Sequence, residues 1–257
     1  MIFSNKFVSA TLEKSTTKKS VAAPYLRRTL VFDKIPQKAE ITVCGLGFYE
    51  LYVNGKRVTK GHMSPYVVNP DQVLPYDNYD LTELMVYGEN VFAFILGNGM
   101  QNSFDGFMWD FQKARWNSAP KLAFALELEI EGVKSVIEAD EQLLCHPSPL
   151  YFDGYRMGEK YDARKIIPDW NGTGCDTSDW TPAIPVQRDC GEAMLACNKP
   201  IVDHSMAEMD CTIATTQMML AAQSLGVGSC WICAFDVPAM AAAFDLPENL
   251  TDRKSVV

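Results

Sequence analysis

The sequence predicts a mainly β protein: a jelly-roll-like antiparallel β-sandwich over residues 1–203, followed by a short two-helix segment over residues 204–257. In the first part, short runs of alternating apolar residues are separated by turn signals. In the second part, the apolar residues follow helical spacing. The chain has 257 residues, of which 47% are hydrophobic and 21% are charged. That composition is typical of a globular protein with a substantial core.

Four runs in the first part have the character of strands. Apolar residues alternate with polar ones at positions 41–43 and again at 49–53, which lead into Asn54-Gly55. This dipeptide predicts a hairpin turn, because both residues tolerate a positive φ. The continuous apolar run 91–96 is typical of a strand buried on both faces. Residues 122–130 alternate strictly and predict a strand with one buried face.

The second part predicts two helices. Helical spacing places five residues on one face of the first helix: Ala214, Met218, Ala221, Ala222 and Leu225. Gly226 follows as a C-cap. Asp236 is expected to cap a second helix with Pro238 in its first turn, and Phe244 is expected on its inner face.

The charge balance argues against two classes of partner. The chain contains 23 Lys and Arg against 32 Asp and Glu, a net charge of −9. Non-specific nucleic-acid binding and binding to anionic membrane surfaces both require an excess of basic residues. The sequence shows no apolar run of membrane-spanning length and no apolar signal segment at its start, so we expect a cytoplasmic location.

The eight cysteines are expected to be reduced thiols, most of them small buried residues. The pair Cys230 and Cys233 has the spacing of a redox motif or of half a zinc site, and this alternative stays open.

Two groups of residues are candidates for binding. Trp109, Trp116 and Tyr155 could stack on sugar faces, and Asn98 could contact a ligand or a metal. The alternatives are ordinary packing for the aromatic residues and a left-handed loop conformation for Asn98. The second group is a charged cluster of Asp153, Glu159, Asp162 and Arg164. Its three carboxylates could provide oxygen ligands for calcium, or they could form an Arg–carboxylate network with Arg164.

Several motifs across residues 22–203 resemble the N-terminal β-sandwich region of bacterial α-L-rhamnosidases. They are Ala23–Arg28, Gly45–Val58, Tyr79–Thr82, Gly88–Asn90, Leu96–Gly99, Gly158–Arg164, Asp179-Trp180 and Pro200–Val202. The resemblance implies a non-catalytic sandwich, because the catalytic carboxylates of that family lie in a helical barrel that follows this region. It also implies L-rhamnose or a rhamnose-containing glycan as the ligand, with calcium as an aid to binding. Met100 departs from the family pattern, which has an aromatic residue at that position.

Residues 205–250 resemble a different family, the FMN-dependent nitroreductases. The matching stretches are Met209–Ala214, Leu220–Ile232, Phe235-Asp236 and Leu246–Glu248. The resemblance implies that the turn formed by Gly228, Ser229, Cys230, Trp231 and Ile232 would lie against a flavin at a dimer interface. The Arg/Ser phosphate-binding segment of that family has no counterpart here.

The sequence therefore predicts a non-catalytic carbohydrate-binding or scaffolding module of an α-L-rhamnosidase-like protein. One alternative is a nitroreductase-type oxidoreductase fragment that binds FMN and dimerises through its helical tail. A second alternative is a truncated fusion with no activity of its own. No catalytic residues are predicted, and the expected cofactors are limited to calcium in the sandwich and to FMN if the tail is functional.

Overall fold

The computed structural model describes residues 1–16, 19–59, 68–103, 111–154, 157–196, 206–232, 236–245 and 255–256. The chain forms two compact units, Met1–Ala196 and Cys197–Val257. The predicted boundary near residue 203 lies outside the described residues.

The first unit is a mainly antiparallel β-sandwich, as the sequence predicts. One sheet has the strand order β14-β1-β8-β3-β6-β15, with β9 beside β8, and only the β15–β6 pair is parallel among the described strands. Its strands are β1 (Phe7–Ser9), β3 (Lys38–Leu46), β6 (Val73–Asp80), β8 (Lys121–Ile130), β9 (Val133–Glu138), β14 (Ile184–Val186) and β15 (Glu192–Leu195).

The second sheet has the order β13-β10-β2-β7-β4-β5. Its strands are β2 (Pro24–Phe32), β4 (Tyr49–Val53), β5 (Lys56–Arg57), β7 (Gly88–Leu96), β10 (Leu144–Pro147) and β13 (Thr181–Pro182). A separate hairpin pairs β11 (Leu150–Gly154) with β12 (Gly158–Tyr161), and single 3₁₀ turns span Thr82–Leu84, Phe111–Lys113 and Ala163–Lys165.

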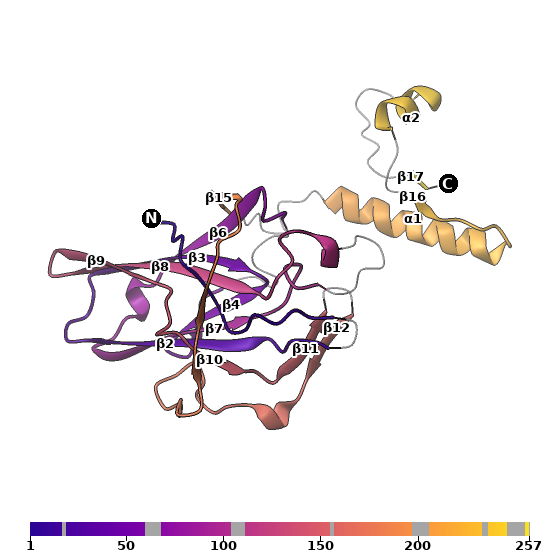
Figure 1. Ribbon diagram of the computed structural model, residues 1–257. Coiled ribbons are helices and arrows are strands. Elements are labelled where there is room, and N and C mark those ends of the chain that lie inside the picture. Colours follow the sequence, from indigo (N-terminus) through magenta and orange to yellow (C-terminus); the bar gives the residue numbers. More distant parts are fainter. Residues whose placement is uncertain are drawn as a thin grey trace. The chain divides into compact units, whose positions relative to one another are not determined.

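The core lies between the two sheets, which Figure 1 shows as two layers with β8 and β9 in one and β2 and β10 in the other. Alternate residues of strands in both sheets point into this space and form one buried apolar cluster. The rings of Phe94 in β7 and Phe124 in β8 are stacked with their centroids 5.9 Å apart, which joins the layers directly. The strand predicted over residues 122–130 is therefore confirmed, with Phe124, Leu126 and Leu128 in this core. The expectation of one buried face is wrong for its first half, because Ala123 and Ala125 are buried as well.

The hairpin turn predicted at Asn54-Gly55 is confirmed, with φ values of 50° and 80°. Glu131 and Gly132, between β8 and β9, form a similar turn with φ values of 50° and 78°. Asn54 also fixes the neighbouring loop, because its side-chain amide donates to the Asn90 side-chain oxygen at 3.0 Å and its oxygen accepts from the Val91 N–H at 2.8 Å.

Strand β7 is buried on both faces, as its apolar run predicts: residues 90–94 are all buried. Phe92 and Phe94 face the core. On the outer side, the segment Trp170–Gly172 is bonded to this sheet. Arg27 of β2 donates to the Trp170 carbonyl, and the Gly55 N–H donates to the Asn171 carbonyl.

The second unit contains α1 (Met206–Ser224), α2 (Val237–Ala243) and the short pair β16 (Trp231–Ile232) and β17 (Ser255–Val256). The predicted helix ends are confirmed. Gly226 has a φ of 78°, and the Asp236 carboxylate accepts from the Ala239 N–H at 3.1 Å. No helix within the described ranges combines the length and apolar character that crossing a membrane requires.

Apolar side chains on the predicted faces of these helices are exposed. Met218 is 62% exposed, Leu225 is 81% exposed and Phe244 is 67% exposed. Helical spacing shows which residues share a face, but it contains no information about whether another element covers that face.

The expectation of buried thiols holds for only some of the cysteines. Cys44 and Cys145 are buried, and burial raises the pKa of each thiol to about 12. Cys190 and Cys230 are exposed, and for Cys230 this differs from the expected small buried residue. Cys233 lies outside the described residues, so the two-cysteine motif stays a prediction.

We predict that truncation after residue 203 leaves a folded domain, because the two buried apolar clusters of the described chain lie within Met1–Ala196. Urea unfolding of the truncated and full-length chains should give the same cooperative midpoint. Loss of a cooperative transition in the truncated chain would show that the second unit is needed for folding.

Candidate functional site

A cleft of about 480 Å³ lies on the outer side of the second sheet. Strands β2, β4 and β7 form its floor, and the β11–β12 hairpin and the segment around Trp170 contribute to its sides. Residues that line it include Tyr25, Phe48, Glu50, Tyr52, Ser148, Asp153, Glu159, Tyr161, Trp170 and Asn171. A concave site with aromatic walls and a few polar groups is typical of small-ligand binding.

Three aromatic side chains pack together in this cleft. The rings of Tyr25 and Trp170 are stacked with centroids 4.1 Å apart and an interplanar angle of 15°. Tyr52 meets Trp170 edge-on at 5.1 Å. Tyr161, from β12, adds a fourth aromatic residue that is 56% exposed. The stack keeps the Trp170 ring in one orientation and leaves it half-buried at the cleft surface.

Arg27 holds the Trp170 segment against the sheet. Its side chain is only 4% exposed, and its Nη1 donates to the carbonyl oxygens of Trp170, at 3.2 Å, and Gly172. Glu89 lies 3.7 Å from its Nη2. A buried guanidinium needs hydrogen-bond acceptors, and the carbonyls of this segment provide them. In return, the bonds from Arg27 hold the segment in place.

Asp153 and Glu159 are register partners across the β11–β12 hairpin, so their side chains lie on the same face. Asp153 accepts hydrogen bonds from the Asn98 N–H at 2.5 Å and from the Asn98 side-chain amide. A Cβ atom on Gly97 would stand 2.8 Å from Asp153 Oδ2, so glycine is needed at this close approach. Glu159 has no hydrogen-bond or ion-pair partner in the part of the chain that the structure describes.

The third carboxylate of the cleft, Glu50, is paired. It accepts a hydrogen bond from the Tyr52 hydroxyl at 2.7 Å, and Arg57 Nη2 lies 2.7 Å from its other oxygen. Unlike Glu159, Glu50 therefore has its charge balanced within the protein.

Comparison with known proteins identifies the family. A sequence profile of the alpha-L-rhamnosidase N-terminal domain matches residues 34–205. The chain belongs to the alpha-L-rhamnosidase N-terminal domain family. An alpha-L-rhamnosidase of Formosa agariphila is 33% identical over 171 residues, which are 62% of this chain and 17% of that protein. One from Streptomyces avermitilis is 26% identical over 62% of this chain and 15% of its own length. The rhamnosidase N-terminal domain therefore spans less than a fifth of each of these two relatives.

Solved structures support the same assignment. The alpha-L-rhamnosidase from Dictyoglumus thermophilum has a TM-score of 0.66 and 26% identity, covering 76% of this chain and 22% of that one. The Streptomyces avermitilis alpha-L-rhamnosidase complexed with L-rhamnose has a TM-score of 0.62 and 26% identity, covering 68% and 17%. A shorter profile match, to the Nitroreductase family, covers residues 192–253.

The predicted sugar contacts of the rhamnosidase N-terminal domain are not gathered in the cleft. Trp116 is only 8% exposed and packs at 6.1 Å from Phe111, away from the residues that line it. Asn98 is 2% exposed. Its amide donates to Asp153 and to the Val21 carbonyl, and its oxygen accepts from Asn102 at 2.6 Å. Trp109 and Tyr155 lie outside the described residues.

Asn98 also differs from the expected left-handed loop residue. The positive φ in its turn belongs to Gly99, at 51°. Asn98 is instead a buried crosslink that joins the turn after β7 to Asp153 of β11.

The predicted calcium ligands Asp153, Glu159 and Asp162 are divided between two places. Asp162 pairs with Arg164 through two hydrogen bonds of 2.8 Å, which agrees with the Arg–carboxylate alternative. It lines a separate shallow depression with Tyr151 and Tyr161. Within the described ranges, no three His, Cys, Asp or Glu side chains gather closely enough to hold a metal ion. The three predicted ligands therefore do not form a calcium shell as they are arranged.

The predicted flavin contacts lie in the second unit, in and after the turn that follows α1. Gly228, Ser229 and Cys230 precede β16, which begins with Trp231 and Ile232. Their role toward FMN stays a prediction.

Sequence reasoning missed the aromatic residues that line the cleft: Tyr25, Tyr52, Tyr161 and Trp170. One signal for them was present. In Trp170-Asn171 an aromatic residue stands next to a hydrogen-bonding side chain, as it does in Trp116-Asn117, whose tryptophan is among the predicted sugar contacts. Tyr25 and Tyr52 lie on the outward face of their strands. They meet Trp170 only because a segment distant in sequence folds over this sheet, and local sequence patterns do not show such a long-range contact.

We predict that Arg27→Met lowers the free energy of unfolding by roughly 1.5–3 kcal/mol, because two carbonyl groups lose a charged donor. Urea denaturation followed by fluorescence would measure this. The matched control is Arg164→Met, whose side chain is 88% exposed and should matter by less than about 0.5 kcal/mol. Equal losses in both variants would contradict the anchoring role of Arg27.

We also predict a pH dependence that originates at Asp153. Burial raises the pKa of Asp153 from 3.8 to about 6, and the hydrogen bonds from Asn98 only partly oppose this effect. The folded state then binds the proton more tightly than the unfolded state, so stability falls as pH rises from about 4 to about 6. Asp153→Asn should remove this slope in denaturation curves recorded across that range.

The control for this measurement is Asp162→Asn. A hydrogen bond from Arg164 lowers the pKa of Asp162 to about 2, so its contribution to stability is lost only as pH falls below about 4. The slope between pH 4 and pH 6 should survive in this variant, and its disappearance there would refute the assignment to Asp153.

Proposed function

We propose that the first unit is a non-catalytic, carbohydrate-binding module of a rhamnosidase-type glycoside hydrolase. The observation that carries this proposal is an aromatic and carboxylate-lined cleft on a domain of the rhamnosidase N-terminal family. L-Rhamnose or a rhamnose-containing glycan is the first ligand to test, because the relatives are named as alpha-L-rhamnosidases.

The chemistry of the cleft suits a sugar. A pyranose presents an apolar C–H face and a rim of hydroxyl groups. The half-buried ring of Trp170 and the exposed ring of Tyr161 offer aromatic surface to the apolar C–H face of the sugar. The carboxylates of Glu159 and Asp153 can accept hydrogen bonds from the hydroxyl groups of the sugar.

The size of the cleft is also suitable. Ligand-binding sites commonly enclose roughly 300–1,000 Å³. At about 480 Å³, this cleft accommodates one or two sugar units. Its floor consists of paired strands, so binding does not require the backbone of the floor to become ordered.

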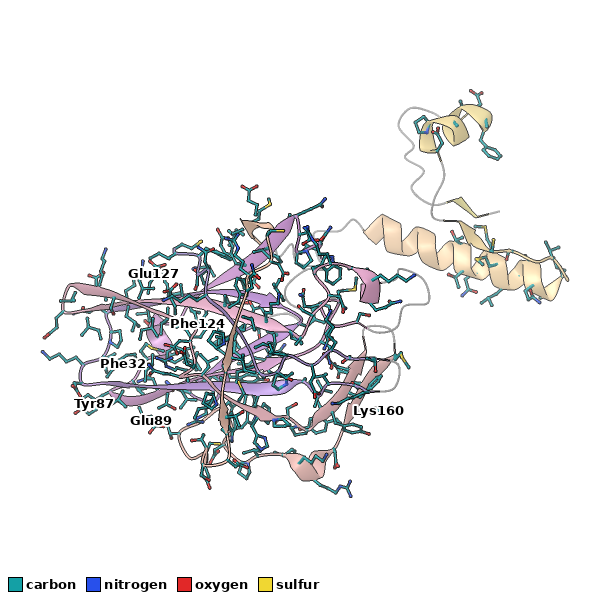
Figure 2. The ribbon with its side chains drawn as sticks, viewed as in Figure 1. Phe32, Tyr87, Glu89, Phe124, Glu127 and Lys160 are labelled. Carbon is teal, nitrogen blue, oxygen red and sulfur yellow. The ribbon has the colours of Figure 1, made fainter. Side chains whose placement is uncertain are left out.

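We predict that Trp170→Ala weakens sugar binding about five- to thirtyfold, since stacking on an aromatic residue is worth roughly 1–2 kcal/mol. Isothermal titration with L-rhamnose and a rhamnose-containing oligosaccharide, each with and without calcium, would measure it. Tyr87→Ala is the matched control, because Tyr87 is 71% exposed and lies outside the cleft. Figure 2 shows Tyr87 at the opposite end of the sandwich from Lys160 of the β11–β12 hairpin.

Two results would overturn this proposal. One is the failure of the unaltered chain to bind any of these sugars, which would favour a scaffolding role. The other is binding that Trp170→Ala and Tyr87→Ala leave equally unchanged, which would place the sugar elsewhere on the domain.

The match of residues 192–253 to the Nitroreductase family supports a second candidate, a flavin-binding role of the tail. The visible absorbance of the purified full-length chain tests it in the same sample. Bound flavin that disappears on truncation after residue 203 would support this role, and a colourless protein after incubation with FMN would contradict it.

A further inference from the structure

We propose that the cleft selects neutral sugar residues over sugar residues that carry a carboxylate, and that Glu159 is the residue that determines this specificity. The inference rests on the proposed carbohydrate-binding function and names the class of sugar that this same cleft would accept.

The charge of the cleft is one-sided. Glu50, Asp153 and Glu159 line it, and no Lys, Arg or His does so among the residues that the structure describes. Arg57 balances Glu50 at 2.7 Å. The charge that is not balanced therefore lies on the β11–β12 hairpin, at Asp153 and Glu159.

The two hairpin carboxylates differ in how much of their charge reaches a ligand. Asp153 is partly buried and receives two hydrogen bonds from Asn98. The negative charge of Glu159 contributes to the raised pKa of Asp153, which is consistent with their closeness across the strand pair. Glu159 itself is exposed and lines the cleft, and it has no hydrogen-bond or ion-pair partner among the described residues.

The nearby cations are engaged in other contacts. Lys160 alternates to the opposite side of β12 and lies 5.1 Å from the centre of the Phe152 ring. Arg164 pairs with Asp162, and Lys165 lies over the Tyr151 ring at 5.8 Å. Arg27 is buried beneath Trp170 and donates to backbone carbonyls. A sugar carboxylate in this cleft would thus meet like charge, and none of the described residues offers a free cation to compensate it.

The test uses one oligosaccharide in two forms. A rhamnose-containing oligosaccharide with uronic acid residues is compared with the same oligosaccharide after its carboxyl groups are reduced to primary alcohols. The two ligands then differ in charge and hardly in shape. In titrations of the full-length chain at pH 7.5 and low salt, the neutral form should bind about tenfold more tightly. Added salt should reduce the difference, because it screens the repulsion.

Glu159→Gln should reduce this preference to within about threefold, because the acidic form no longer meets the charge of Glu159. The readout is the ratio of the two affinities, since both forms lose the same hydroxyl contacts to the Glu159 carboxylate. Glu159 lies on an exposed hairpin strand, so the substitution preserves the fold. The matched control is Glu141→Gln, which removes one exposed carboxylate outside the cleft and should leave the preference unchanged.

Each other outcome has a distinct meaning. If neither form binds, the proposed carbohydrate-binding function fails and the selectivity fails with it. If both forms bind the unaltered chain equally, the function stands and the selectivity is overturned. If the preference is unchanged in Glu159→Gln, the role assigned to Glu159 is overturned.

Discussion

The buried charge of Arg27 is the constraint on which the outer side of the sandwich depends. A guanidinium that is 4% exposed needs acceptors, and the carbonyls of Trp170 and Gly172 provide them. This requirement brings a segment from far along the chain onto β2 and β4, where its Trp170 ring meets Tyr25 and Tyr52. The Tyr25–Trp170 stack then covers surface that would otherwise face water, and the cleft forms beside it.

The same constraint explains why a sandwich sheet here is buried on both sides. Antiparallel sheets commonly have one face in the core and one face in water, and their strands then alternate. Strand β8 departs from the rule, because residues 122–126 are all buried. In β7, residues 90–94 are also all buried, and the segment Trp170–Gly172 is bonded to Arg27 and Gly55 on the outer side of the same sheet. The apolar run of residues 91–96 was thus a signal for a covering segment, although it did not show which segment.

Much of the fold was predictable because its signals are local. Alternation marks β8, and Asn54-Gly55 marks a turn whose backbone needs a positive φ. The cleft was predicted poorly because it is not local. Asn98 and Asp153 were both singled out from the sequence, but only the structure shows that they bind each other. The exposure of the apolar face of α1 could not be predicted for a related reason, because periodicity does not show whether another element covers a face.

Asp153 and Glu159 are neighbouring carboxylates with different roles. They are register partners on one hairpin, yet Asp153 is held by Asn98 and contributes to the stability of the fold, while Glu159 is exposed and lines the cleft. Desolvation is a cost to folding that Asp153 bears and that the exposed Glu159 largely avoids. A change at position 159 can therefore alter the charge that a ligand meets while the hairpin keeps its anchor. A change at position 153 alters both, so ligand preference in this cleft is most readily tuned at Glu159.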